Sequence, residues 1–209
     1  MRPMTSKARQ NPVAAELRSF SRLILLALTV LFISSCSGSL FKVKPVTDLP
    51  PMPANVASAN LGSISFRAAP MLSDEESQAL FETNLQLAGL LPVRVEIKHN
   101  GGEVIDLKMV RFHLTDAAGT KWKAIPLKQA IARILKANGV SSYNPTSRKT
   151  FEHEFRAYEL DLKTPITTAE GRREGLVIFL APDKAPVSSP QGLALTIDGF
   201  SQPVTLRLN

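Results

Sequence analysis

Val93-Arg94-Val95-Glu96-Ile97-Lys98 is the stretch that most strongly predicts the fold. Its aliphatic side chains take the odd positions and its charged side chains take the even ones, as in a strand with one buried and one solvated face. Asn100-Gly101-Gly102 follows, and its glycines accept the positive φ angles of a tight turn. The stretch therefore predicts an antiparallel β-strand that leads into a hairpin.

Further strand patterns run through the chain, and turn-forming Pro, Gly, Ser or Asn residues separate them. The segment 176–180 is continuously apolar, so we expect it to be a central strand. In the segment 105–114 the apolar residues change from odd to even positions between Met109 and Val110, which predicts a β-bulge there. The other strand patterns cover residues 64–68, 121–125, 158–162, 193–197 and 204–208.

Helix signals stand between these strands. Ser73 and Glu76 form a capping-box pattern that begins a helix directed towards Gly89. Pro126 suits the first turn of a second helix, which we expect over 126–138 because Asn138-Gly139 then ends it. A third, short helix is expected from Pro145.

About eight short strands with turn signals between them predict a mainly β fold. We expect residues 62–209 to form a β-sandwich into which two or three helices are inserted, with a helical insertion near 126–157 between the two halves of the sheet. There is no internal repeat.

The N-terminal segment has the pattern of a signal peptide. Its apolar run, 23–33, is 11 residues long and would span roughly 16 Å as a helix, whereas a bilayer core needs about 20 such residues. Five basic residues and one acidic residue precede the run, as in the positively charged flank of a signal peptide. We therefore expect residues 1–35 to be a cleaved leader rather than a membrane span.

Ile33-Ser34-Ser35-Cys36 ends the apolar run and resembles the bacterial lipobox. The resemblance implies a lipoprotein: diacylglycerol on the Cys36 thiol, cleavage before Cys36, and acylation of the new amine. By resemblance to enterobacterial sorting rules, Ser37 favours the outer membrane over the inner one. The alternative is a buried thiol after an ordinary cleavage site. Localisation in a bacterial cell envelope, facing the periplasm or the cell surface, is the resulting expectation.

Residues 36–61 resemble a flexible tether in composition. They contain Pro45, Pro50, Pro51 and Pro53, and proline-rich chains extend by about 3.1 Å per residue. Such a tether could lift the domain by up to roughly 75 Å.

Charge and cysteine content exclude several function classes. Of the net charge of +7, the leader contributes +4, because residues 37–209 contain 20 basic and 17 acidic residues. The basic pI is thus no argument for nucleic-acid binding. Cys36 is the only cysteine, so its lipidation would leave no thiol for a disulfide, a metal or a nucleophile.

No catalytic motif is found. His99, His113 and His153 lack the spacing of a metal-binding helix, and there is no Gly-x-Ser-x-Gly or Ser-x-x-Lys motif. We therefore expect no catalytic residues, no metal and no cofactor.

Aromatic side chains gather around the helical insertion and could contact a partner. We select Trp122, Tyr143, Phe151, Phe155 and Tyr158 as a possible partner-binding set. Their alternative role is core packing.

Two further resemblances concern the domain. Segments 81–85 and 89–97, with the Asn100-Gly101 turn, look like a pattern in uncharacterised bacterial lipoproteins. The strand at 93–97, its turn, and segments 112–119 and 175–179 also resemble immunoglobulin-like modules of surface proteins. These resemblances imply a fold and carry no catalytic residues.

Two functions follow as expectations. The first is a non-enzymatic, lipid-anchored binding or structural module that meets an envelope protein. The alternative is an envelope-processing enzyme or a periplasmic assembly chaperone with a groove beside the helices. A cluster of His, Asp or Glu in a deep pocket would favour the enzyme, and a shallow apolar patch around Trp122 and Tyr143 would favour the binder.

Overall fold

The alternating stretch forms β3 (Leu90–His99), which pairs with β2 (Ile64–Pro70) on one side and β6 (Arg172–Leu180) on the other. The structure is a computed structural model that describes residues 41–140 and 145–209. The described residues all belong to one compact unit. The strand and central-strand predictions for β3 and β6 are confirmed, because each has a partner strand on both edges.

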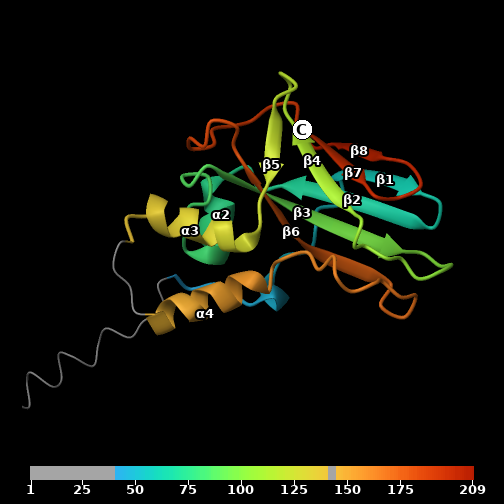
Figure 1. Cartoon of the computed structure of the whole chain (residues 1–209), viewed down its shortest axis with the longest axis horizontal. Helices are drawn as coiled ribbons and strands as arrows, with labels where there is room; N and C mark the ends of the chain where they lie inside the picture. Colours follow the sequence, from blue (N-terminus) through green and yellow to red (C-terminus); the bar gives the residue numbers. More distant parts are fainter. Residues whose placement is uncertain (1–40, 141–144) are drawn as a thin grey trace, which may run out of the picture. The chain divides into compact units, whose positions relative to one another are not determined.

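Eight strands form one antiparallel sheet in the order β1-β2-β3-β6-β5-β4-β7-β8 (Figure 1). The edge strands β1 and β8 approach each other, so the sheet nearly closes. The remaining strands are β1 (Ala57–Leu61), β4 (Arg111–Thr115), β5 (Lys121–Ala124), β7 (Ala194–Asp198) and β8 (Val204–Arg207).

The mainly β class with inserted helices is confirmed, but a two-sheet sandwich is not. The short strand β5 joins the two halves of one continuous sheet. Its residues Lys121 and Trp122 pair with β4, and its residues Lys123 and Ala124 pair with β6. The spacing of strands along a sequence predicts how many there are, but the closure of the sheet depends on this change of partner within four residues.

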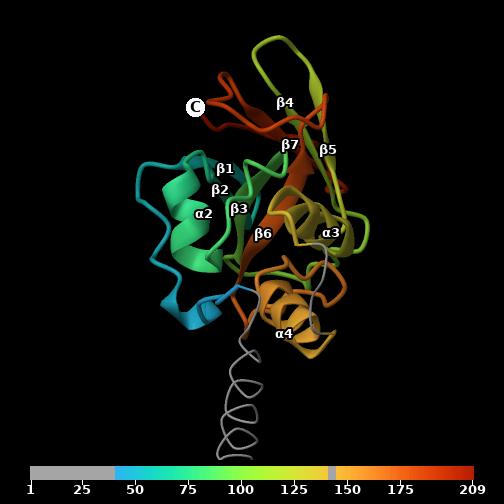
Figure 2. The ribbon, with the colours of Figure 1, turned by 90° about the vertical axis from the view of Figure 1, so that its left-hand side faces the viewer.

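The three α-helices of the described residues gather at one end of the sheet (Figures 1 and 2). They are α2 (Asp74–Phe81), α3 (Leu127–Ala137) and α4 (Pro145–Arg156). The predicted capping box is confirmed: the Ser73 hydroxyl accepts the Glu76 N–H at 3.3 Å, and the Glu76 carboxylate accepts the Ser73 N–H at 3.2 Å. Helix α2 ends earlier than expected because Glu82 has a left-handed backbone, with φ of 49°.

The buried apolar side chains form two clusters. The inner core fills the nearly closed sheet and includes Phe66, Val95 and Leu195. The helix core lies between the helices and the sheet and includes Phe81 and Ile134. Strand β6 contributes side chains to both clusters, which explains why its sequence is continuously apolar.

The tether prediction is wrong for residues 57–61 and for two residues before them. Residues 57–61 form the edge strand β1, in register with β2 from Ala57 opposite Ala68 to Leu61 opposite Ile64. Val43 and Met52 are buried, at 7% and 6% exposure. The segment contains four prolines, but its buried side chains hold it against the domain. Residues 36–40 lie outside the described residues.

Two strand predictions also require correction. The expected β-bulge at Met109 is a turn, in which the Val110 N–H bonds to the Leu107 carbonyl at 3.0 Å and strand β4 begins only at Arg111. The segment 158–162 makes a single isolated bridge, between Glu159 and Leu176.

Candidate functional site

The sheet is interrupted where β5 ends, between β4 and β6. This strand ends at Ala124, and Pro126 then begins α3. Within the described residues, β4 pairs with β5 only through Leu114 and Thr115. The first half of β4 therefore faces β6 across a gap that no strand fills.

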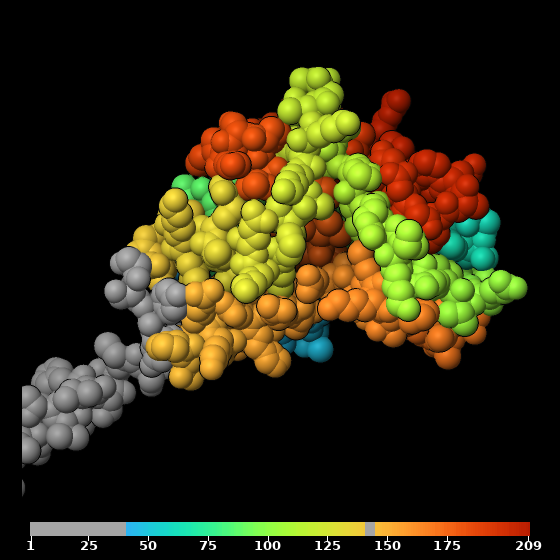
Figure 3. Space-filling view, in the orientation of Figure 1, coloured from blue at the N-terminus to red at the C-terminus, as the bar shows by residue number. Residues whose placement is uncertain are grey.

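A cavity of about 280 Å³ occupies this gap. Figure 3 shows the hollow between β4 and β5, with atoms of β6 visible at its bottom. We call it the interstrand cavity. Most of its lining is apolar, from Val110, Phe112, Ala124, Ile125, Leu127, Leu160, Leu162, Leu176, Val177 and Ile178.

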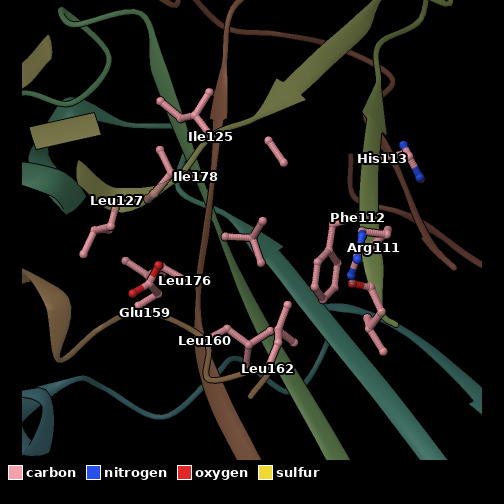
Figure 4. Close-up of a pocket in the computed structure, with 13 residues that line it drawn as sticks. Arg111, Phe112, His113, Ile125, Leu127, Glu159, Leu160, Leu162, Leu176 and Ile178 are labelled. Carbon is pink, nitrogen blue, oxygen red and sulfur yellow. Dashed lines mark hydrogen bonds between the residues drawn. The ribbon is translucent and has the colours of Figure 1, made fainter. Parts of the chain in front are cut away.

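Three polar residues also line the interstrand cavity: Arg111, His113 and Glu159. In Figure 4, Phe112 lies on the cavity side of β4, whereas His113 points away from the cavity. The His113 Nε2 atom lies 3.1 Å from the Asp198 carboxylate on β7; the His113 side chain is exposed and that of Asp198 is partly buried. The cavity can therefore hold an apolar group, with polar side chains around it.

The Arg111 side chain is bonded to backbone carbonyls of residues just before it in the chain. Its Nη1 atom donates hydrogen bonds to the carbonyl oxygens of Lys108 and Val110, both at 2.8 Å. These bonds stabilise the turn before β4 and so help to keep the gap open.

A chain of alternating charges crosses β2, β3 and β6 on the opposite face of β3 from the inner core. Arg94 pairs with Glu174, which also pairs with Arg172. Arg172 lies 2.8 Å from Glu96, and Glu96 lies 3.4 Å from Arg67. We call these five residues the ion-pair network.

The N-terminal segment covers the ion-pair network. Arg94 donates to the carbonyl of Pro50 at 2.6 Å, and Arg67 donates to the carbonyl of Met52 at 3.3 Å. Arg94 and Glu96 are consequently buried, at 8% and 5% exposure. The sequence pattern predicted a solvated face for these positions, and this prediction is wrong because a distant segment folds over them.

The charges in the ion-pair network compensate one another. Burial raises the pKa of Glu174, but hydrogen bonds from Arg172 and Arg94, together with their charges, outweigh it and leave this pKa below its ordinary value of 4.5. Hydrogen bonding to Glu174 in turn raises the pKa of Arg172, partly opposed by burial. The Glu174 carboxylate is held as an anion between two guanidinium groups, which is the chemistry of a structural network rather than of a general acid.

The structure divides the predicted aromatic set between the two cores. Trp122 belongs to the inner core, and its indole N–H donates to Asp116 at 3.3 Å. Phe151, Phe155 and Tyr158 belong to the helix core and are almost fully buried. These four side chains therefore have the packing role that was the alternative. Tyr143 and the lipidation residue Cys36 lie outside the described residues.

The three histidines do not meet. His99 is buried at the end of β3, and its Nε2 atom has no hydrogen-bond partner among the described residues. His153 is exposed on α4. Within residues 41–140 and 145–209, no group of three or more His, Cys, Asp or Glu side chains is placed to hold a metal ion.

Sequence reasoning missed the interstrand cavity. Two signals pointed towards it: the phase change near Met109, which marks the late start of β4, and the short apolar pattern at 121–125 directly before Pro126. Neither signal shows that the late start of β4 and the early end of β5 lie next to each other. Their proximity depends on the strand order β6-β5-β4, which the sequence does not reveal.

The chain matches no known protein family, no curated protein and no solved structure. Among the helices of the described residues, none combines the length and the hydropathy that a membrane span requires.

Proposed function

We propose that this chain is a lipid-anchored cell-envelope protein and acts as a non-enzymatic binding module. The interstrand cavity is its ligand site, and the observation that carries the proposal is the apolar lining of this cavity. Its ligand is an apolar group, such as a side chain of an envelope protein or part of a lipid.

The apolar walls of the interstrand cavity favour the binding of an apolar ligand. Each Å² of apolar surface that a ligand covers contributes about 25 cal/mol. Leu160, Leu176 and Ile178 line the cavity and are themselves nearly buried, so their positions are set by the folded core before a ligand arrives. A preformed site loses little conformational entropy on binding.

The polar groups nearby support binding rather than catalysis. An enzyme site needs an acid, base or nucleophile aimed at the reacting atom. Arg111 is bonded to backbone carbonyls, and His113 is directed towards Asp198. Glu159 can orient a ligand with a donor group, as polar residues in apolar pockets do.

The lipid anchor is supported by the leader, by its basic flank and by the lipobox resemblance at Cys36. Labelled palmitate is expected to enter the wild-type protein and to be absent from Cys36→Ala. Equal labelling of the two proteins would refute the anchor. Ser37 supports the outer membrane, and separation of the two membranes on a density gradient tests this.

The cavity is tested with fluorobenzene as the probe, observed by ¹⁹F NMR. Leu162 and Leu208 are both half-buried against the inner core, but only Leu162 lines the cavity. Leu162→Phe fills part of the site, so we expect it to weaken fluorobenzene binding by about tenfold, equivalent to 1.4 kcal/mol. Leu208→Phe is the matched control and is expected to bind as the wild type does. Equal binding by all three proteins would contradict the proposed site.

A second candidate function is an assembly chaperone that holds an extended segment. The observation in its favour is the free side of Arg111–His113, where β4 faces the gap. An added strand could bond to this edge while its side chains enter the cavity. An alternating Val-Thr peptide tests it: N-methylation of the peptide backbone is expected to abolish binding if strand addition is the mode. Unchanged binding would mean that only side chains of the peptide enter the cavity and that no strand is added to β4.

A relation to immunoglobulin-like modules stays a proposal, supported by the resemblance of 112–119 and 175–179.

A further inference from the structure

We propose that α4 and residues 41–46 form a membrane-facing surface that rests on anionic lipid headgroups. This proposal depends on the lipid anchor at Cys36 proposed above. It assigns a role to a face of the molecule that the interstrand cavity does not use.

The distance along the chain from Cys36 to this surface is short. Five residue steps separate Cys36 from Phe41, and a fully extended chain covers about 18 Å in five steps. The Phe41 ring then contacts the ring of Phe151 on α4, with centroids 5.2 Å apart. An anchor at Cys36 would therefore hold α4 near the bilayer rather than at the end of a long tether.

Residues 41–46 are fixed to the domain. Val43 is buried, and the N–H of Lys44 donates to the carbonyl of Leu80 at 2.8 Å. The carbonyl of Lys44 accepts a hydrogen bond from the Tyr158 hydroxyl at 2.8 Å. Because the chain leaves the domain beside α4, the anchor restricts which face can turn towards the membrane.

The exposed side of α4 is basic. Lys149, His153 and Arg156 are exposed and lie four and three residues apart, so they share one face of the helix. The opposite face carries the buried Phe151 and Phe155. A hollow lined by Lys149, Glu152, His153, Arg156 and Ala157 lies on this exposed side.

The net charge of the mature chain is concentrated here. Residues 41–46 and α4 contain five basic and two acidic residues, a net charge of +3. Residues 37–209 as a whole contain 20 basic and 17 acidic residues, which is also +3, so the rest of the mature chain is neutral. Each Lys or Arg at an anionic surface contributes about 1 kcal/mol. The acyl anchor would supply the lasting attachment, and these charges would set the orientation.

The opposite end of the domain provides the comparison. The turn between β4 and β5 lies at the far end from α4 in both views (Figures 1 and 2). Thr150 on α4 and Thr120 in this turn are both exposed. With Cys36 lipidated, Thr150→Cys or Thr120→Cys would provide the single free thiol in the chain.

The experiment uses the full lipidated protein in vesicles of equal parts phosphatidylcholine and phosphatidylglycerol. Each thiol carries a nitrobenzoxadiazole fluorophore, and a small fraction of the lipid carries a nitroxide on its headgroup. We expect several-fold stronger quenching at position 150 than at position 120. Equal quenching at the two positions would overturn the proposal.

Charge reversal tests the electrostatic part. Lys149→Glu with Arg156→Glu is expected to reduce quenching at position 150 to the level at position 120. Lys121→Glu with Lys123→Glu, on exposed positions of β5, is the matched control and should leave the quenching at 150 unchanged. Unchanged quenching in the α4 variant, with an unaltered circular dichroism melt, would overturn the role of these charges.

Failure of this proposal and failure of the lipid anchor give different results. If Cys36 is not acylated, palmitate labelling is absent and the protein does not remain with the vesicles. If Cys36 is acylated and the domain turns freely, the protein stays with the vesicles and the two fluorophores are quenched alike.

Discussion

The hydroxyl of Tyr158 donates a hydrogen bond of 2.8 Å to the backbone carbonyl of Lys44, 114 residues earlier in the chain. It joins the segment that follows α4 to the first described residues. Burial, and secondarily the negative charge of Asp48, raise the pKa of Tyr158 above its ordinary value of 10.0. The phenol therefore remains protonated, and remains a donor, across the physiological pH range.

Tyr158→Phe removes this donor and retains the ring in the helix core. We expect it to lower the free energy of unfolding by roughly 1 kcal/mol, the typical net contribution of one hydrogen bond. We also expect faster trypsin cleavage after Lys42, because residues 41–46 would lose one of their attachments. Cleavage after Arg67 serves as the internal control. An unchanged rate at Lys42 would show that Val43 and the bond to Leu80 hold the segment without Tyr158.

Removal of residues 41–61 tests whether this segment is part of the folded domain rather than a loose tether. A protein that begins at residue 62 lacks strand β1 and the buried side chains of Val43 and Met52. Full burial of such side chains contributes about 1.5–3 kcal/mol each, and the loss of β1 exposes the edge of β2. We expect it to melt at a lower temperature than a protein that begins at residue 41, and to aggregate more readily. Identical melting curves would restore the interpretation of a loose tether.

The sequence predicted the elements of the fold better than their arrangement. Alternation identified β3 and the capping box identified the start of α2, because both signals depend on residues close in the chain. β1 was missed because its sequence, Ala57-Ser58-Ala59-Asn60-Leu61, has a single large apolar residue, Leu61, and follows a proline-rich segment. It is a strand because β2 pairs with it, and that contact has no local signal.

The candidate site was less predictable for the same reason. The aromatic set was chosen for its position along the chain, but Trp122 and Phe155 face different cores. The charges of β3 were expected in solvent, whereas Arg94 bonds to Pro50, 44 residues earlier. Both outcomes depend on which distant segments come together when the sheet nearly closes.

Gly175 on β6 is predicted to tolerate no side chain. A Cβ atom there would lie 2.5 Å from the Leu160 Cα atom and 2.6 Å from its nitrogen. Both contacts are with backbone, so the segment that lines the interstrand cavity would have to move. We expect Gly175→Ala to destabilise the fold by about 1–3 kcal/mol, the usual cost of overpacking, and to alter fluorobenzene binding.

Gly62→Ala is the control for this prediction. Gly62 has a φ of 57° and no atoms near the position of an added Cβ, so the substitution introduces only backbone strain of about 1 kcal/mol. We expect denaturant titration to show the larger loss for Gly175→Ala, and fluorobenzene binding to change in this variant alone. A loss at Gly175 no larger than at Gly62 would contradict the close packing of β6 against Leu160.

Glu174 makes the stability of the fold depend on acid pH. Its pKa in the folded protein lies below the ordinary value of 4.5 because hydrogen bonds from Arg172 and Arg94 and their charges outweigh the opposing effect of burial. A carboxylate with a lowered pKa contributes stability that is complete above pH 4.5 and is lost as the pH falls through the folded-state pKa.

Glu174→Gln removes this contribution and leaves Arg94 without its carboxylate partner. At pH 7 we expect a loss of about 2 kcal/mol, in the range of hydrogen bonds to charged groups. Urea titrations from pH 7 to pH 3 measure the difference from the wild type, which should shrink below pH 4.5 because protonated Glu174 then resembles glutamine. Glu103→Gln, at an exposed position in the loop after β3, is the control and should show no such convergence. A difference that stays constant down to pH 3 would mean that Glu174 contributes by packing rather than by charge.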